Sequence, residues 1–180
     1  NPDDISLLAV SKTWPAADVR EAALAGQRSF GENYVQEGVD KARTLVALDL
    51  DWHFIGPLQS NKTRAVAETF AWVHSIDRLK VAERLSGQRP DNLPALQVCI
   101  QVNVSGETSK SGVSPDEASA LAHGVAELPH IQLRGLMAIP EPVDDFARQR
   151  AAFRRVRGVF ERLNKEGLSL DTLSMGMSHD

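Results

Sequence analysis

The chain has 180 residues, of which 42% are hydrophobic and 24% are charged, and its formal net charge is −4. These proportions are typical of a soluble globular domain, and the acidic balance argues against a non-specific nucleic-acid binder, which needs a basic surface. A single cysteine, Cys99, excludes an internal disulfide framework and fits a reducing compartment such as the cytoplasm. No apolar run approaches the roughly 18–20 residues of a membrane span, so no membrane association is expected.

The first half of the chain alternates between strand-like and helix-like segments. Residues 5–10 are nearly all apolar, which predicts a strand covered on both faces. Pro15 favours the start of a helix, and Gly26 can end it. Further strands are predicted at 28–31, 52–55 and 70–76, and further helices along the stripe from Val35 to Val46, at 61–68, and at 79–86 with Asp77 as the N-cap.

The second half continues this alternation. Residues 96–104 alternate between apolar and polar side chains and predict a strand. Ser114 to Glu117 has the pattern of a capping box, with proline at the first helical position, ahead of a helix with an apolar stripe over 118–125. Strands are predicted at 131–137 and 168–173, and between them a helix from about 144 to 166 with Phe146, Phe153 and Phe160 on its buried side.

Repeated strand–helix units, with connections long enough to hold a helix, predict an α/β fold with a parallel sheet. No Gly-x-Gly-x-x-Gly motif follows the first strand, which weakens a dinucleotide-binding fold. Seven regular units favour a TIM (β/α)8-type barrel over an open doubly wound sheet. The composition does not shift and there is no long linker, so residues 1–180 are expected to form a single domain.

Chemistry in such a barrel lies at the carboxyl ends of the strands, and Lys12 directly follows the first strand. An ammonium group at the end of a buried strand is costly unless it is paired or neutral. A desolvated lysine loses its proton more readily and can form a Schiff base with an aldehyde. Alternatively, Lys12 reaches the rim and pairs with Glu32 or Asp77.

Two loops carry groups suited to anions. Residues 106–111 resemble a phosphate-binding loop, but the glycine spacing is wrong for that motif, so only a contact between Lys110 and an anionic ligand is expected. The turn from Ser174 to Ser178 follows the seventh strand, where barrels often bind phosphate through backbone N–H groups. An ordinary turn with a serine N-cap is a compatible alternative, because an N-cap serine is also a place where an anion docks.

The five histidines do not have the spacing of metal ligands, and Cys99 stands alone, so no metal site is expected. His53 and His74 fall inside predicted strands and are interpreted as residues whose hydrogen bonds are satisfied there. Trp72 and Met137 are interpreted as core or pocket lining.

Several motifs occur in order along the chain: Ala9–Thr13, Phe30–Glu37, His53–Lys62, Asn103 with Ser109–Gly112, Arg134–Pro140 and Leu173–Ser178. Together they resemble the YggS/PROSC family of pyridoxal phosphate homeostasis proteins. The resemblance implies a barrel like that of alanine racemase and pyridoxal 5'-phosphate (PLP) as cofactor. It implies that Lys12 carries PLP as an internal Schiff base and that Asn33 lies beside the ring. It also implies that Met137 lines the site and that the turn from Ser174 to Ser178 binds the cofactor, with Ser178 on the phosphate.

Members of that family bind the cofactor without an established turnover, so the resemblance implies a cytoplasmic PLP carrier or buffer and not an enzyme. Its expected partners are PLP and PLP-dependent apo-enzymes, and a monomer is expected. The alternative is a small amino-acid racemase, but racemisation needs a base on each face of the substrate, and Lys12 supplies only one while Tyr34 is the only tyrosine. A third hypothesis is a phosphosugar-binding barrel with no cofactor.

Family members begin with a helix before the first strand and continue beyond position 180 with a helix and an eighth strand that carries a Val-Arg-Ile-Gly block. Residues 1–4 read Asn-Pro-Asp-Asp, which is neither a signal peptide nor a methionine start. We therefore expect the given chain to be truncated or incompletely ordered at both ends, without that first helix and that eighth strand.

Overall fold

The chain alternates strands and helices over the residues that the computed structural model describes, which are 4–104, 111–140 and 144–177. The strands are β1 (Ala9–Val10), β2 (Ser29–Glu32), β3 (Asp51–Phe54), β4 (Trp72–Ile76), β5 (Leu96–Gln101), β6 (Ile131–Met137) and β7 (Thr172–Ser174). The α-helices are α1 (Ala16–Leu24), α2 (Val35–Thr44), α3 (Thr63–Thr69), α4 (Leu79–Gln88), α5 (Ala118–Ala126) and α6 (Phe146–Lys165). Two short 3₁₀ helices, η2 (Val46–Leu48) and η3 (Ser60–Lys62), precede β3 and α3.

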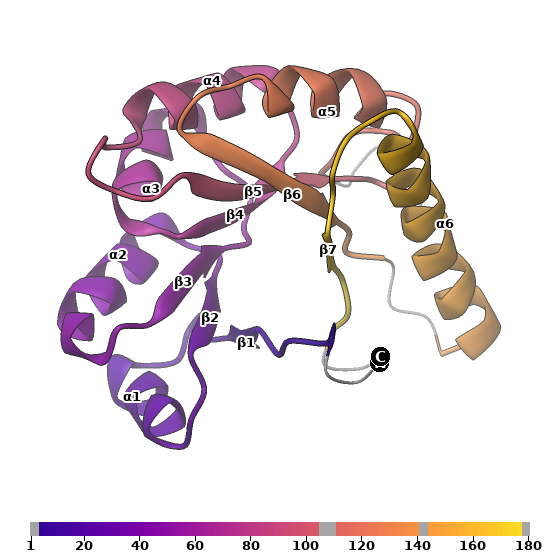
Figure 1. Ribbon diagram of the computed structural model, residues 1–180. Helices are drawn as coiled ribbons and strands as arrows, with labels where there is room; N and C mark the ends of the chain where they lie inside the picture. Colours follow the sequence, from indigo (N-terminus) through magenta and orange to yellow (C-terminus); the bar gives the residue numbers. More distant parts are fainter. Residues whose placement is uncertain (1–3, 105–110, 141–143, 178–180) are drawn as a thin grey trace.

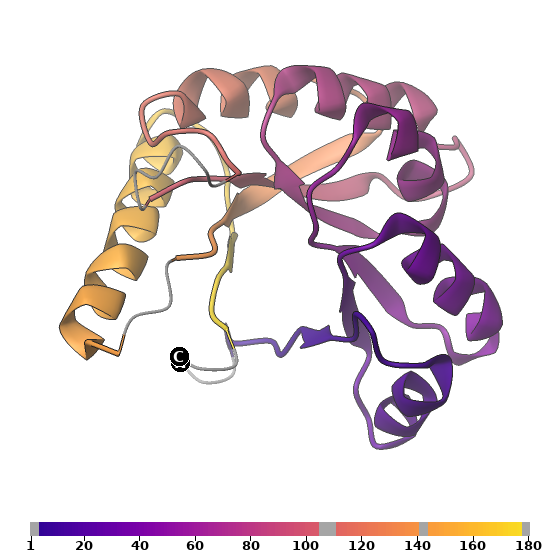
Figure 2. The same ribbon diagram turned by 180° about the vertical axis from the view of Figure 1, so that it is seen from behind.

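Every strand pairs in parallel with the next strand along the chain, in the order β1 to β7. Right-handed crossovers in such a sheet place all the helices on the same side. Figure 1 shows the helices following one another along the outer side of a curled sheet, and Figure 2 shows the same arrangement from behind. Register shifts in β4–β5 and β5–β6 add to the curl. The predicted TIM-type barrel is confirmed, as a half-barrel of seven strands within the described residues.

Strand alternation divides the side chains between a helix-facing outer face and an inner face. On β5, Leu96, Val98 and Ile100 are fully buried in the hydrophobic core that includes residues of the surrounding helices. The alternate residues of the strand, Gln97, Cys99 and Gln101, therefore point to the inner face. The core thus lies between sheet and helices, and polar and aromatic side chains are found on the inner face.

Several predicted elements are confirmed closely. Strand β6 has the predicted bounds. The two hydrogen bonds of the capping box form: the Ser114 N–H donates to Glu117 Oε2 at 3.0 Å and the Glu117 N–H donates back to Ser114 Oγ at 3.3 Å. The predicted helix start is wrong, however, because α5 begins at Ala118 with Glu117 as its N-cap, and Pro115 is therefore not the first helical residue. The apolar stripe of α5 that follows is buried as predicted: Ala118, Leu121, Ala122 and Val125.

The prediction for the first strand is wrong in length and burial. Only Ala9 and Val10 are paired, and Ile5 and Leu7 are 80% and 74% exposed. The physical reason is that, in the part of the chain that the structure describes, β1 is an edge strand paired with β2 alone, so the apolar run there is not covered on both faces.

Three helix details also differ from the predictions. Helix α2 ends at Thr44, and Val46 lies in η2 with 77% of its surface exposed, because the chain leaves the helical path after Leu45. The N-cap of α4 is Arg78 and not Asp77, whose carboxylate accepts from the Arg78 guanidinium at 3.1 Å. Phe146 is the first residue of α6 and is exposed, since it precedes the part of the helix that packs on the core.

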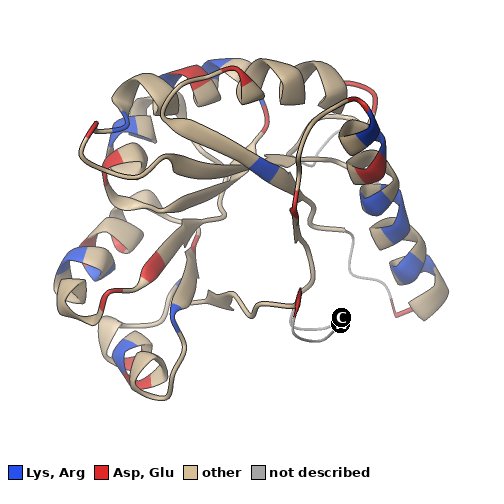
Figure 3. Ribbon diagram, in the orientation of Figure 1, with Lys and Arg blue, Asp and Glu red and all other residues tan. Residues whose placement is uncertain are grey.

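Helix α6 is long enough to cross a membrane, but its composition forbids this. Figure 3 shows basic residues, coloured blue, recurring along the ribbon of α6, and residues 146–165 include six arginines and one lysine against one glutamate. None of the described helices is long and apolar enough to span a bilayer.

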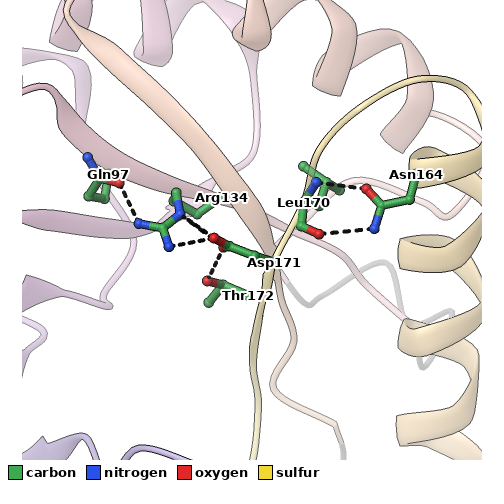
Figure 4. Close-up of polar contacts among 6 residues, drawn as sticks. All are labelled: Gln97, Arg134, Asn164, Leu170, Asp171 and Thr172. Atoms are coloured by element: carbon green, nitrogen blue, oxygen red, sulfur yellow. Dashed lines mark hydrogen bonds and ion pairs between the residues drawn. The ribbon is translucent and has the colours of Figure 1, made fainter. Parts of the chain in front are cut away.

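Two side-chain clamps attach the start of β7 to its neighbours (Figure 4). The Arg134 guanidinium of β6 donates to both carboxylate oxygens of Asp171, with distances of 2.9 and 2.6 Å, and to Gln97 Oε1 at 2.8 Å. The Asn164 side chain of α6 exchanges two hydrogen bonds with the backbone of Leu170, at 2.7 and 3.0 Å. Hydrogen bonds from the Arg134 guanidinium lower the pKa of Asp171, so this pair persists well below neutral pH.

Gly135 provides a direct test of the β6–β7 contact, because a Cβ built there would overlap the carbonyl oxygen of Thr172. We expect Gly135→Ala to lower the free energy of unfolding by about 2 kcal/mol or more, since the two backbones must separate. Gly158→Ala on α6 is the control: its Cβ meets nothing within 4 Å, and it should be neutral or stabilising by up to about 1 kcal/mol. Urea unfolding of both variants measures the difference, and equal midpoints would contradict this account of the packing.

Candidate functional site

The candidate site residues fall at the carboxyl ends of strands at the two edges of the sheet. Lys12 follows β1 and Asn33 follows β2, and the two segments are held in register by the hydrogen bond from the Ser11 N–H to the Gly31 carbonyl at 2.9 Å. Met137 ends β6 and pairs in register with Ser174, the last residue of β7. Two further candidates, Lys110 and Ser178, lie outside the described residues.

The Lys12 side chain is exposed and has no hydrogen bond or ion pair among the described residues. Within the described residues Lys12 is therefore not desolvated, because β1 is an edge strand that only β2 flanks there. The predicted ion pair of Lys12 with Glu32 or Asp77 is also wrong, since Glu32 is paired with Lys41 and Asp77 with Arg78. Lys12 is thus an amine at the strand end that none of the described acidic groups engages.

The turn that carries Lys12 is held in place by hydrogen bonds to the buried ammonium group of Lys41. Lys41 Nζ donates to the Ser11 carbonyl at 2.6 Å and to Glu32 Oε1 and Glu37 Oε1, each at 2.7 Å. The Ser11 hydroxyl donates to the same Glu32 oxygen at 2.6 Å. Charged groups this deeply buried are stable only when each is paired and hydrogen-bonded, so the network holds Ser11 in one position.

The same network holds the other side of Lys12. The Thr13 N–H donates to Glu37 Oε1 at 2.6 Å, and Thr13 adopts a left-handed φ of 67°, which is uncommon for a residue other than glycine. The hydrogen bond from Lys41 lowers the pKa of Glu37; partial desolvation opposes it, and the Thr13 N–H contributes to the lowering. Glu37 is therefore ionised at neutral pH and fixes the residue that follows Lys12.

Two buried oxygen atoms near this turn lack a partner among the described residues: Glu32 Oε2 and Asn33 Oδ1. The Asn33 backbone is held closely against Gly56, because a Cβ at position 56 would overlap the Asn33 carbonyl oxygen. A buried acceptor without a donor costs about 1–3 kcal/mol, so a donor on a ligand or a water would stabilise this end of β2.

The inner face of the sheet holds a chain of hydrogen bonds that reaches Ser174. His53 Nδ1 lies 2.9 Å from His74 Nε2, and His74 Nδ1 lies 2.7 Å from Ser174 Oγ. The chain joins β3, β4 and β7, so it crosses the interior that the curl encloses. These contacts confirm the interpretation of both histidines as strand residues that are hydrogen-bonded within the fold.

Aromatic and cationic groups extend this arrangement along the inner face. The Trp72 indole stacks on the His53 ring with centroids 5.4 Å apart and an interplanar angle of 9°. The Arg134 guanidinium carbon lies 5.1 Å from the Trp72 ring centroid, which is a cation–π contact. The stacked Trp72 therefore holds the His53 ring in one orientation.

Burial keeps both imidazoles neutral. It lowers the pKa of His53 to about 3, with a further contribution from His74, and lowers the pKa of His74 to about 4. At neutral pH each ring therefore carries one N–H and one acceptor nitrogen.

Sequence reasoning missed Lys41 and Glu37 as supports of the Lys12 turn. Their spacing of four residues within one helix is the only sequence signal, and it normally indicates an exposed ion pair. The burial of Lys41 depends on the packing of α2 against β1 and β2, which no pattern within the helix reveals.

The fold and the site place the chain among barrels of the alanine racemase type. The alanine racemase N-terminal domain pattern matches residues 3–180. The alanine racemase of Clostridium difficile 630 superposes with a TM-score of 0.79 at 13% identity, over 95% of this chain and 46% of the racemase chain. That likeness concerns the fold alone.

Closer relatives define the family. A pyridoxal phosphate homeostasis protein of Pseudomonas aeruginosa is 62% identical over 180 residues, which is all of this chain and 77% of the relative. The Escherichia coli K12 protein of the same name is 56% identical, over all of this chain and 78% of the relative. The structure of PipY from Synechococcus elongatus with PLP bound superposes with a TM-score of 0.91 at 40% identity, over 100% of this chain and 85% of that one. The chain belongs to the family of pyridoxal phosphate homeostasis proteins.

The Lys41 network can be tested by removing its cation. Lys41→Met should lower the free energy of unfolding by about 3–5 kcal/mol, because the carboxylate of Glu32 is then buried without a counter-charge. Adding Glu32→Gln should restore part of this loss, since it removes the orphaned charge. Lys80→Met, at an exposed position of α4, is the control. Urea unfolding decides the matter, and a loss below about 1 kcal/mol for Lys41→Met would show that the pair is not strongly coupled.

The histidines make stability depend on pH. A histidine whose pKa is lower in the folded state than its ordinary value near 6.5 stabilises the fold fully above that value and loses its contribution as pH falls. Between about pH 6.5 and 5, we expect unfolding free energy to fall by about 1.4 kcal/mol per pH unit for each histidine. His74→Asn should flatten this slope, whereas His130→Asn, at an exposed position, should not. Urea midpoints at several pH values measure both slopes, and an unchanged slope in His74→Asn would contradict the assignment.

Proposed function

We propose that this chain binds pyridoxal 5'-phosphate and acts as a carrier or buffer of the cofactor in PLP homeostasis. The printed names of its relatives and the PLP-bound PipY neighbour support this proposal. The observation that carries it in this chain is Lys12, an amine with no partner among the described residues, on a turn that is hydrogen-bonded on both sides.

The residues at this end of the sheet fit the chemical groups of PLP. The Lys12 amine can condense with the aldehyde, in which case its nitrogen replaces the aldehyde oxygen and water leaves. The unpartnered Asn33 Oδ1 is available to a donor, and the buried Met137 can line one side. PLP supplies a reactive aldehyde and an electron-withdrawing ring. We propose Ser174 and Ser178 as contacts of its phosphate and Lys110 as a further anion contact.

The same geometry favours a carrier over a racemase. A second base is needed on the other face of a substrate, and Tyr34 is 60% exposed at the start of α2. His74 is not a free base, because both of its ring nitrogens are already hydrogen-bonded. The racemase alternative gains no support from the relatives, which are named as homeostasis proteins. A cytoplasmic location, a monomeric state and PLP-dependent apo-enzymes as partners belong to the same proposal.

The role of Lys12 is tested by spectroscopy of the loaded protein. The wild type should show a visible absorbance band that disappears in Lys12→Ala, because the amine that joins the aldehyde is lost. Lys80→Ala, at an exposed lysine of α4, should keep the band. Borohydride reduction followed by mass analysis should place the added mass on Lys12 in the wild type.

Other results would overturn parts of this proposal. If Lys12→Ala holds the cofactor with the same spectrum, Lys12 is not the attachment point. Steady turnover of D- or L-alanine by the pure protein, lost in Lys12→Ala, would favour the racemase. A colourless protein whose spectrum is unaffected by added PLP would favour a phosphosugar-binding barrel.

A further inference from the structure

The hydrogen-bonded chain His53–His74–Ser174, here called the relay, has a direction. The first contact joins His53 Nδ1 to His74 Nε2, and the second joins His74 Nδ1 to Ser174 Oγ. A neutral imidazole carries one N–H, so His74 must donate at one of its nitrogens and accept at the other. The hydrogen bonds at its two sides are therefore coupled, and the whole chain has only two polarities.

The two polarities leave the Ser174 hydroxyl with opposite roles. In the first, His53 Nδ1–H donates to His74 Nε2, and His74 Nδ1–H donates to Ser174 Oγ, so the serine O–H is free to donate to a ligand. In the second, the serine O–H donates to His74 Nδ1 and His74 Nε2–H donates to His53 Nδ1, so Ser174 presents only lone pairs. An anion such as phosphate is stabilised by the first polarity and repelled by the second.

We propose that His53 and His74 are positioning residues that hold the Ser174 hydroxyl as a hydrogen-bond donor toward the phosphate of the cofactor. The inference rests on the proposed function, because it assigns the ligand of Ser174 there. It adds two buried residues on β3 and β4 that act on the ligand only through Ser174 on β7.

The surroundings of the relay suit this role. His53 is stacked flat against Trp72, which in turn lies under the Arg134 guanidinium, so the ring at the far end is fixed in orientation. The relay is uncharged at neutral pH, because burial lowers the pKa of both histidines. Ser174 itself is held by pairing with Met137 and by the hydrogen bond from the Ala138 N–H to its carbonyl at 3.0 Å. The freedom that remains at Ser174 is therefore the direction of its hydroxyl.

Asparagine and glutamine each reproduce one of the two polar positions of the His74 ring. The two variants therefore separate a positioning role of His74 from a packing role. The NH2 group of asparagine reaches the place of Nδ1 and is a donor without needing a partner to set its tautomer, so His74→Asn should keep the donated contact to Ser174 although it loses the contact with His53. The amide of glutamine reaches the place of Nε2, so His74→Gln should keep the contact with His53 and lose the one with Ser174. Absorbance titrations with PLP and with pyridoxal, which lacks the phosphate, measure the affinity of each variant.

We expect His74→Gln to weaken PLP binding by about tenfold to a hundredfold, the loss typical of a hydrogen bond to a charged group. Pyridoxal binding should change by less than about threefold in the same variant, and His74→Asn should stay within about threefold of the wild type for both ligands. Ser174→Ala should weaken PLP binding as His74→Gln does, and the double variant should lose no more than either single one. Equal losses for PLP and pyridoxal, or an additive double variant, would overturn the proposal.

A second measurement needs no variant. Nitrogen NMR of the wild type with bound PLP should show both His53 and His74 as neutral Nδ1–H tautomers. An Nε2–H tautomer at either residue, or a protonated ring, would overturn the proposal even if a variant failed to fold. If the wild type binds no PLP, the proposed function fails by itself. The relay is then judged with inorganic phosphate as the probe, which should produce the same two tautomers, and their absence would overturn it too.

Discussion

The buried ammonium group of Lys41 joins the first two strands to α2, and the candidate site depends on it. Its three hydrogen bonds reach the backbone before Lys12 and two carboxylates, one of which holds the backbone after Lys12. An edge strand of two paired residues cannot hold the backbone around Lys12 in place by itself. The buried Lys41 network fixes this backbone, because breaking any one of its contacts leaves an unpaired charged or polar group in a medium of low polarity.

The curl of the sheet produces the second feature of the site. The described helices lie on the outer side, so none of them covers the inner face, and side chains of strands that are not neighbours meet there. His74 of β4 reaches Ser174 of β7, and Arg134 of β6 reaches Trp72 of β4. Polar groups enclosed in this way must satisfy one another, which gives neutral histidines and a directed chain of hydrogen bonds. The Lys41 network at the edge of the sheet and the histidine hydrogen bonds of its interior thus both reach residues at the carboxyl ends of the strands.

Much of the fold was predictable because it depends on local patterns. The bounds of β6 and the reciprocal capping box of Ser114 and Glu117 follow from alternation and from residue spacing. The wrong predictions concern segments whose burial depends on residues far away in the sequence. Residues 5–10 look like a central strand but lie at the sheet edge, and Val46 continues a helical stripe that the chain has already left. Neither error could be corrected from the segment itself.

The sequence alone determined the order of strands and helices, the parallel barrel class, and the position of Lys12 after the first strand. These properties follow from periodicity and chain order, which need no knowledge of what packs against what. Only the tertiary structure decided that Lys12 has no partner among the described residues, that Lys41 is buried beneath it, and that two histidines on separate strands meet a serine one hundred residues further on. Burial and pairing depend on side chains that folding brings together from distant parts of the chain, so no local sequence pattern predicts them.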